Sequence, residues 1–236
     1  MKKDGYKIVF KDFLAAKSIV IKEVVSSRII DSNLEKKCKD KWKTMIIDAK
    51  QKGKKLWDSD VYRFESGEIK NGILYLKVST VPFSIRFPMN FYTEQLENLG
   101  ANYGSMGMFT SCFVKTLDNK FIFIEKSGKY YSNKKVSFVG GVLSKTEKIL
   151  LNGKDLFNEV LKEVREEIGI SGVDIDKKIF RCIYITNDKN VCLIFDIFLN
   201  KAFNELKNKF SIKNDGEAKE LIGITEFEFK NFIKKI

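Results

Sequence analysis

The sequence of 236 residues contains no histidine. This absence excludes catalytic triads that use an imidazole base, and it excludes zinc or haem sites bound through histidine. The four cysteines form no C-x-x-C motif and no cluster; they stand at Cys38, Cys112, Cys182 and Cys192. We interpret them as buried thiols in a reducing compartment. Any catalysis must therefore use carboxylates, lysines, tyrosines or a metal ion held by oxygen ligands.

Long apolar runs are also missing. No stretch of 18 apolar residues occurs, and the first residues, MKKDGYKIVFKDF, alternate charged and apolar side chains where a signal peptide would be apolar. We therefore expect neither membrane insertion nor secretion, and we predict a cytoplasmic protein. The composition, with 44% hydrophobic and 31% charged residues, is that of a folded chain with one large domain or two smaller ones.

Arginine is scarce, because only five of the 43 basic residues are arginine, although the formal net charge is +12. Such a charge suits a polyanionic partner. However, surfaces that read phosphates and bases tend to use arginine, and an excess of lysine also arises from genome composition. Nucleic acid is therefore an alternative partner that the charge alone does not favour.

The first hundred residues predict a small α+β unit. Strand patterns cover residues 6–10, 17–25, 62–64, 73–79 and 83–87. Apolar residues at spacings of three and four, from Leu34 to Ala49, indicate a helix with one buried face, opened by a capping box of Ser32 and Glu35. The glycines of LGANYGSMG mark the expected domain boundary, which divides the chain into residues 1–104 and 105–236.

The second unit mixes strands and helices without a regular alternation. Two apolar runs around Asp118-Asn119 predict a hairpin, and a short strand then ends in Gly140-Gly141. Further strands are expected at residues 179–185, 191–199 and 221–224, and helices at 155–168, at 201–209 and after the capping box of Thr225 and Glu228. This pattern predicts a mixed β-sheet covered by helices on both faces.

The helix KDLFNEVLKEVREEIGI has an apolar stripe and an acidic stripe. Asp155 is the expected cap, Gly169 the expected stop, and the apolar stripe repeats every four residues at Leu156, Val160, Val164 and Ile168. The acidic stripe consists of Glu159, Glu163, Glu166 and Glu167. Like charges at these spacings repel one another, so something should offset the repulsion.

Two explanations of the acidic stripe are open from its spacing. Lys162 and Arg165 could compensate the charges on a solvated helix face, or the carboxylates could bind a divalent cation, since Mg²⁺ prefers oxygen ligands. The pair Gly140-Gly141 favours the second explanation, because glycines after a strand permit a close backbone approach to a ligand or metal.

The residues from Gly141 to Ile170 resemble the Nudix box, G-x5-E-x7-R-E-U-x-E-E-x-G-U, in which U is a bulky apolar residue. Gly141 and Glu147 match its start, and KEVREEIGI matches its end at every defined position except the first. That position holds Lys162 where the family has arginine, and 14 residues instead of seven separate Glu147 from it. The added length would lie in the loop before the helix, where it costs little.

The resemblance covers residues 105–236 and implies the Nudix fold, a mixed β-sheet in an α/β/α sandwich, preceded by the small α+β domain. It implies a metal-dependent hydrolase whose substrate is a small-molecule nucleoside diphosphate joined to another group. By position, the ligands of Mg²⁺ or Mn²⁺ are expected to be Glu163, Glu166 and Glu167, near a backbone carbonyl of Gly140 or Gly141. Nudix enzymes often form dimers, so a homodimer is also compatible with the resemblance.

Three other residues are placed by the same resemblance. A glutamate late in the domain often serves as base or ligand, and Glu217 and Glu220 stand there, with ordinary loop charge as the equal alternative. Lys126 follows the strand FIFIE, where family members often carry a basic residue that faces the substrate phosphates; a solvated lysine is the alternative.

The segment LWDSDVYRF is similar to the N-terminal region of nucleotide-sugar diphosphatases that act on UDP-glucose or UDP-galactose. This similarity favours a nucleotide sugar such as UDP-glucose or ADP-ribose, cleaved to a nucleoside monophosphate and a sugar phosphate. Trp57 is a candidate to stack on a base or sugar, with a place in the core as the alternative.

Other functions on the same fold stay open. One is a catalytically weak or inactive module that binds nucleotide or RNA, which would suit the basic charge and Lys162, although the intact glutamates argue against it. Another is RNA decapping, which uses the same box. Isopentenyl diphosphate isomerase shares the fold, but its metal site uses histidines, which this chain lacks.

Overall fold

The structure is a computed structural model that describes residues 7–131, 135–145, 150–210 and 217–234. A large mixed sheet has the order β1-β8-β9-β5-β6-β10, and β7 pairs with the outer part of β6. Its strands are β1 (Lys7–Leu14), β5 (Met108–Lys115), β6 (Lys120–Lys126), β7 (Val136–Ser137), β8 (Ile175–Ile185), β9 (Val191–Leu199) and β10 (Ala218–Thr225). Among the described strands of this sheet, β5 and β9 are parallel neighbours and the other pairs are antiparallel.

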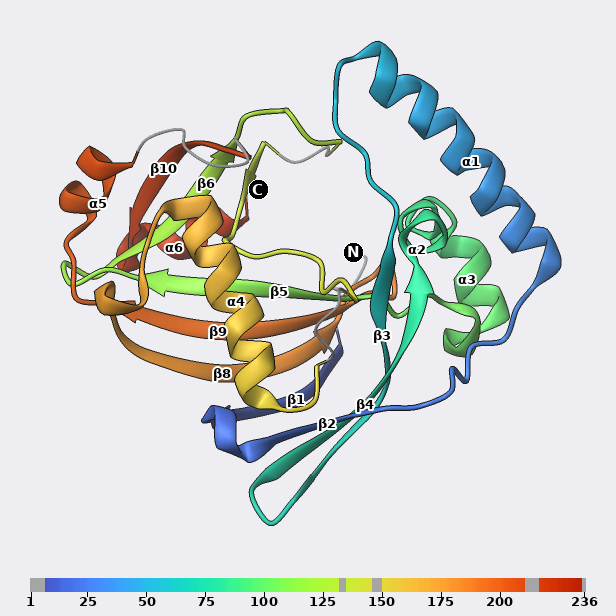
Figure 1. Cartoon of the computed structure of the whole chain (residues 1–236), viewed down its shortest axis with the longest axis horizontal. Coiled ribbons are helices and arrows are strands. Elements are labelled where there is room, and N and C mark those ends of the chain that lie inside the picture. Colours follow the sequence, from blue (N-terminus) through green and yellow to red (C-terminus); the bar gives the residue numbers. More distant parts are fainter. Residues whose placement is uncertain (1–6, 132–134, 146–149, 211–216, 235–236) are drawn as a thin grey trace.

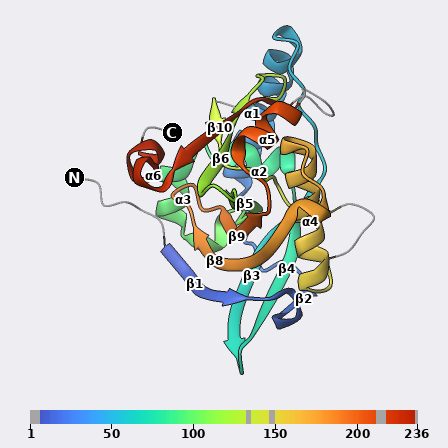
Figure 2. The same ribbon diagram turned by 90° about the vertical axis from the view of Figure 1, so that its left-hand side faces the viewer.

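Helices cover the large sheet on both faces, as Figures 1 and 2 show. On one face lies α4 (Gly153–Ile168), whose residues Leu156, Val160 and Val164 are buried in the main core. On the other lies α6 (Glu226–Ile233), where the ring of Phe229 packs 4.5 Å from that of Phe121. The short helix α5 (Phe203–Lys209) precedes β10. The predicted α+β class with a mixed sheet between helices is confirmed.

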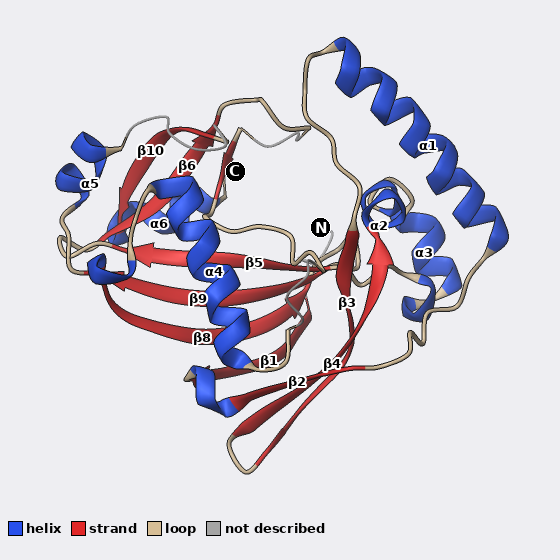
Figure 3. Ribbon diagram, in the orientation of Figure 1, coloured by secondary structure: helices blue, strands red, loops and turns tan. Residues whose placement is uncertain are grey.

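A smaller sheet and three helices come from the first hundred residues, and Figure 3 shows them beside the large sheet. The sheet has the order β2-β4-β3, made of β2 (Ile19–Glu23), β4 (Ile73–Pro82) and β3 (Asp60–Lys70). The helices are α1 (Ser32–Gln51), α2 (Phe83–Met89) and α3 (Thr93–Leu99). They enclose a second apolar core that includes Trp42, Met45 and Phe83.

The first hundred residues also join the rest of the chain. β1 adds a strand to the large sheet by pairing with β8, and the hydroxyl of Tyr62 accepts a hydrogen bond of 3.0 Å from the Leu150 amide. Leu74 and Val78 of β4 belong to the same apolar core as α4. The division at residue 104 stays a prediction, because these contacts link both sides of it.

Three local predictions need correction. The segment 83–87 was predicted as a strand from the alternation of Phe83, Ile85 and Phe87, but it forms helix α2 and packs against α1. An apolar run this short is compatible with the period of a strand or of a helix, so its packing against α1 decides which one forms. Helix α4 is capped by Asn152, whose side chain accepts from the Lys154 and Asp155 amides, and Asp155 itself lies within the first turn.

The beginning of α1 differs in the same way. Asp31 caps the helix by accepting the Leu34 amide at 2.7 Å, one residue before the predicted capping residue Ser32. Glu35 instead forms an ion pair with Arg28. In the described ranges, no helix combines the length and the apolar character needed to cross a membrane.

Candidate active site

Helix α4 places Glu163 and Glu167 one turn apart on the side that faces a glycine turn. The apolar stripe of the helix is buried against the sheet, and Gly169 ends the helix in the left-handed conformation, with φ of 72°. Glu167 is therefore held on a rigid element, as the spacing in the sequence predicted.

The glycine turn lies against strand β5. The Thr110 amide donates to the Gly141 carbonyl at 2.8 Å, and the Gly141 amide donates to the Thr110 hydroxyl at 3.3 Å. Gly140 has φ of 144°, and a side chain there would collide with the Thr110 backbone. A Cβ atom on Gly141 would lie only 2.6 Å from the carboxylate of Glu163. Gly140 is thus needed for the turn to approach strand β5, and Gly141 for it to approach Glu163.

Glu167 is buried, with 2% of its surface exposed. Its Oε2 accepts a hydrogen bond of 2.8 Å from the Gly140 amide, whereas its Oε1 is buried without a hydrogen-bond donor among the described residues. Burial raises the pKa of Glu167 well above its usual range, and the charges of Glu217 and Glu163 act in the same direction. The Gly140 hydrogen bond and Lys126 offset this only in part.

Glu163 is in a similar environment. Burial raises its pKa to about 7, and the charges of Glu166, Glu217 and Glu159 add to the effect, while Lys162 opposes it. Two neighbouring carboxyl groups therefore resist ionisation in the metal-free protein. A bound cation would favour their charged forms, because an opposite charge close to a carboxylate lowers its pKa.

The strand ends of β6 and β10 bring Lys126 and Glu217 to this cluster. Lys126 Nζ and Glu217 Oε1 form an ion pair of 2.6 Å, and both side chains are partly buried. The charge of Glu217 acts on both Glu163 and Glu167, so this loop glutamate lies close to them. Lys126 is paired with Glu217 in this state.

The structure does not bring two other predicted residues to the cluster. Glu220 is exposed and pairs with Lys207 of α5 at 2.9 Å. Trp57 stacks on Phe83 with ring centroids 4.3 Å apart, against the core enclosed by α1 and α2, which matches the alternative given above for it. Glu147 of the motif lies outside the described residues.

The carboxylate oxygens of the cluster suit a hard divalent cation that takes only a few of its ligands from the protein. Across the ranges that the structure describes, no three Asp, Glu, Cys or His side chains are grouped closely enough to bind a metal ion by themselves. Mg²⁺, however, usually takes one or two carboxylates and completes its shell with water and substrate phosphates. Glu167 Oε1, which lacks a donor, and Glu163 beside Gly141 supply such carboxylates.

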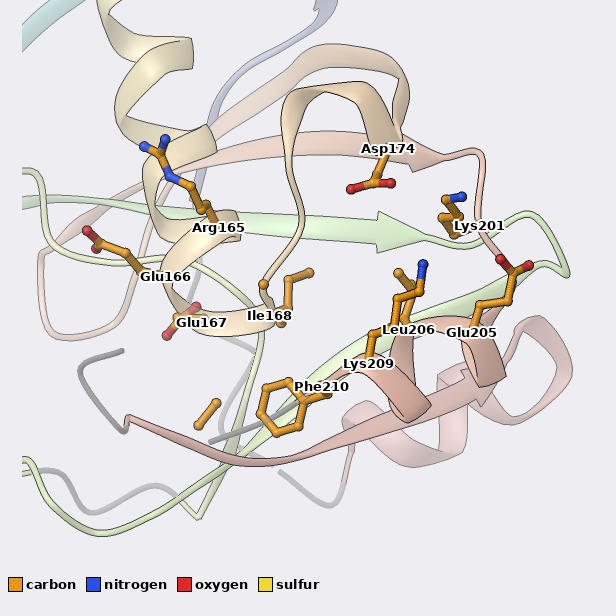
Figure 4. Close-up of a pocket in the computed structure, with 12 residues that line it drawn as sticks. Arg165, Glu166, Glu167, Ile168, Asp174, Lys201, Glu205, Leu206, Lys209 and Phe210 are labelled. Atoms are coloured by element: carbon orange, nitrogen blue, oxygen red, sulfur yellow. The ribbon is translucent and has the colours of Figure 1, made fainter. Parts of the chain in front are cut away.

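A cavity of about 350 Å³ opens beside the cluster (Figure 4). It runs from Glu166 and Glu167 on α4 to α5, with Ile168, Leu206 and Phe210 as apolar lining. In Figure 4 Arg165 points away from Glu167, so it does not replace the motif arginine as a partner of that carboxylate. Lys162, in the motif position, acts on Glu163 by its charge alone.

Thr110 is the residue of this site that the sequence did not indicate. It is 2% exposed and fixes the glycine turn with its amide and its hydroxyl. The contact joins residues 31 positions apart, so no local spacing in the sequence could reveal it.

No protein-family model matches the sequence, and neither does any curated protein. The solved structures that match it include Nudix hydrolases. The three structures described below have low sequence identity to this chain and TM-scores below 0.5.

Three of these structures illustrate the match. A NUDIX hydrolase from Nitrosomonas europaea is 17% identical with a TM-score of 0.36, over 53% of this chain and 76% of that protein. The MutT protein from Methanosarcina mazei is 15% identical with a TM-score of 0.34, over 55% of this chain and 91% of that protein. A bifunctional NMN adenylyltransferase/ADP ribose pyrophosphatase from Francisella tularensis is 13% identical with a TM-score of 0.38, over 61% and 41%.

Proposed function

We propose that the chain is a divalent-metal-dependent Nudix hydrolase that cleaves the diphosphate of a nucleoside diphosphate derivative. The observation that carries this proposal is the pair of glutamates next to a glycine turn, buried Glu167 and half-buried Glu163, which no arginine of the described residues pairs with. Lys126 and Lys162 offset the desolvation of these carboxylates only in part, which costs stability, and a bound cation would remove that cost. The proposed substrates are nucleotide sugars such as UDP-glucose or ADP-ribose, which would give a nucleoside monophosphate and a sugar phosphate.

In this proposal Glu163 and Glu167 hold Mg²⁺ or Mn²⁺, and Glu166 is a further ligand or orders the attacking water. When bound, the metal supplies neutralisation of the phosphate charge and a lowered pKa for bound water. The amide of Gly140 donates a hydrogen bond to one carboxylate oxygen of Glu167 and so fixes the side-chain conformation. The other oxygen would then already be oriented to bind the cation. Glu217 is the proposed general base, once Lys126 turns from it toward the phosphates of the substrate.

The test is hydrolysis of a substrate panel with Mg²⁺ or Mn²⁺. The panel contains UDP-glucose, ADP-ribose, dinucleoside polyphosphates, nucleoside triphosphates and capped RNA, and Glu167→Gln is the variant. We expect one class to be turned over by the wild type and not by the variant. Glu220→Gln is a matched control, because Glu220 is exposed and pairs with Lys207 away from the cluster. Equal turnover by the wild type and Glu167→Gln would contradict the proposal.

A second candidate is a module that binds nucleotide or RNA without efficient catalysis. Lys162 favours it, because a lysine cannot brace two carboxylates as the planar fork of an arginine does. Metal-dependent binding of nucleotides or RNA with no turnover of any panel member would support this candidate. Turnover of capped RNA alone would indicate the decapping reaction.

A further inference from the structure

The cavity beside the glutamates has no role yet in the proposed reaction. Glu166 and Glu167 of α4 line one end of it, so the cavity adjoins the carboxylates that would hold the metal (Figure 4). Its volume of about 350 Å³ lies at the lower end of the range for ligand pockets in proteins. Such a space suits a single ring of a ligand rather than a whole nucleotide sugar. It can therefore take one part of a substrate whose diphosphate lies at the glutamates.

Part of the cavity wall is apolar. Ile168 and Leu206 belong to the main core, and Phe210, directly after α5, packs against the same core. Gly169 ends α4 at this wall, and a Cβ atom built on it would meet no other atom within 4 Å. The helix end thus leaves open space beside the apolar side chains. A ligand ring that lies there would remove its C–H surface from water.

Charged side chains line the end of the cavity that is farther from the glutamates. Asp174 from the turn after α4, Lys201 from the loop after β9 and Lys209 of α5 are drawn there in Figure 4. Hydrogen bonds from Ser171 lower the pKa of Asp174, and the charges of both lysines lower it further. Both ammonium groups therefore lie near this carboxylate. Neither of them, however, forms an ion pair or a hydrogen bond within the described parts of the chain.

One carboxylate near two ammonium groups suits the adjacent hydroxyl groups of a sugar. A hydroxyl both donates and accepts, so one can donate to Asp174 while its neighbours accept from Lys201 and Lys209. A further phosphate would instead be repelled by Asp174 and by Glu205, which also lines this end. A nucleobase is bound mainly by stacking on aromatic rings, and Phe210 is the one aromatic residue among the described residues that line the cavity. The lining therefore favours a sugar over a phosphate or a base.

We propose that this cavity binds the sugar that the diphosphate joins to the nucleoside, and that Asp174, Lys201 and Lys209 bind its hydroxyl groups. The nucleoside then extends from the glutamates in another direction. The inference rests on the proposed function, because it takes the substrate to be a nucleotide sugar. It adds that the sugar is recognised directly, so a nucleotide without a sugar beyond its diphosphate would bind more weakly.

The test is equilibrium binding of two analogues to the full chain with Mg²⁺, measured by titration calorimetry. One is UDP-glucose with a methylene group in place of the bridging oxygen, and the other carries a methyl ester in place of the glucose. The two have the same charge, and neither is cleaved at its bridge. We expect the glucose to increase the affinity at least about tenfold, as for one hydrogen bond to a charged group. The same pair with adenine in place of uracil should show a similar increase, because the base lies elsewhere.

Two variants separate contacts with the sugar from a general effect of charge. Lys209→Gln removes a positive charge and Asp174→Asn removes a negative one, so their general effects on the binding of an anionic diphosphate should have opposite signs. Both variants should instead lower the increase from glucose to about twofold or less. Lys207→Gln is the matched control for Lys209→Gln, because Lys207 lies on the same helix, does not line the cavity and pairs with Glu220. It should leave the increase unchanged.

The readout is binding, so it is independent of turnover. An increase from glucose that depends on Asp174 and Lys209 in a protein without hydrolytic activity would support the sugar site and contradict the proposed reaction. Turnover that depends on Glu167, combined with no increase or with one that survives both variants, would overturn the sugar site alone. Variants that change the ratio of uracil to adenine affinity would place the base in the cavity and overturn the sugar site. No binding of any analogue would overturn it as well.

Discussion

Two half-buried glutamates in this chain, Glu65 and Glu163, have opposite electrostatics. Glu65 lies at the small sheet, where it pairs with Arg63 and accepts from the hydroxyls of Ser27 and Ser79. Burial alone would raise its pKa, but these hydrogen bonds and the charge of Arg63 outweigh burial and lower the pKa to about 2. Within the described ranges no side chain donates a hydrogen bond to Glu163; burial raises its pKa to about 7, and only the charge of Lys162 opposes this.

The difference indicates what each site is for. At Glu65 the sequence supplies the counter-charge, so the ion pair is complete within the fold. Around Glu163 and Glu167 the charges of Lys162 and Lys126 offset the desolvation of the carboxylates only in part, which costs stability in the metal-free protein. A cost of this kind is retained where a ligand removes it, and perturbed carboxyl groups cluster at functional sites for this reason.

The largest expected effect is on turnover. Glu167→Gln should lower kcat/KM for the preferred substrate by about 10³-fold, because a metal ligand contributes several kcal/mol to stabilising the transition state. Glu65→Gln should leave the turnover of the folded protein unchanged. Initial rates at saturating Mn²⁺, normalised to the folded fraction, test the contrast; a similar loss in both variants would contradict it.

The next largest effect is on the stability of the fold, at the ion pair of Glu65 with Arg63. Glu65→Gln should destabilise the fold by about 2–3 kcal/mol, because it leaves Arg63 buried without its carboxylate. The stabilisation by Glu65 is present above pH 4.5 and is lost as the pH falls toward 2, since its pKa is lowered in the fold. Urea unfolding of the variant near neutral pH measures the loss. Unchanged stability would contradict the claim that the Glu65 ion pair stabilises the fold.

The same substitution at Glu163 should change the free energy of unfolding in the opposite direction. Glu163→Gln should stabilise the metal-free protein by about 2 kcal/mol above pH 7, because it removes a charge whose desolvation Lys162 offsets only in part. A raised pKa means that the wild type is most stable below pH 4.5 and loses stability as the pH rises toward 7. Thermal unfolding in EDTA from acid to mild alkaline pH, for both proteins, would show this difference closing at low pH.

The smallest effect is expected at Glu220, the exposed glutamate that the resemblance also suggested. Its pKa is lowered by a hydrogen bond from Lys207, and both side chains are about half exposed. Exposed ion pairs contribute little to stability. Glu220→Gln should change neither the melting temperature nor turnover. A loss of turnover in this variant would instead place Glu220 in the site.

Much of the fold could be predicted from local patterns. The apolar stripe of α4 with its stop at Gly169, the hairpin around Asp118-Asn119 and strand β9 all follow from spacing and turn residues, and they are confirmed. The exchange of a strand for α2 at residues 83–87 could not be foreseen, since the apolar surface of α1 decides it. The addition of β1 to the large sheet is likewise a long-range pairing.

The site divides in the same way. The glutamates of α4 are one helical turn apart by sequence, so their common face was predictable. The contact of Thr110 with Gly141 and the ion pair of Lys126 with Glu217 depend on how distant strands align, and sequence spacing does not record that alignment. The role of the predicted residues in catalysis, and the cytoplasmic location, stay predictions.

The central claim is that Glu163 and Glu167 together bind a divalent cation. Titration calorimetry of Mn²⁺ binding at about pH 6.5, in two buffers of different ionisation enthalpy, tests it most directly. Because the pKa of Glu163 is about 7, binding should release protons and the heat should differ between the buffers. Both the binding and the proton release should be lost in Glu167→Gln. Binding without proton release, or binding that is unchanged in Glu167→Gln, would contradict the claim.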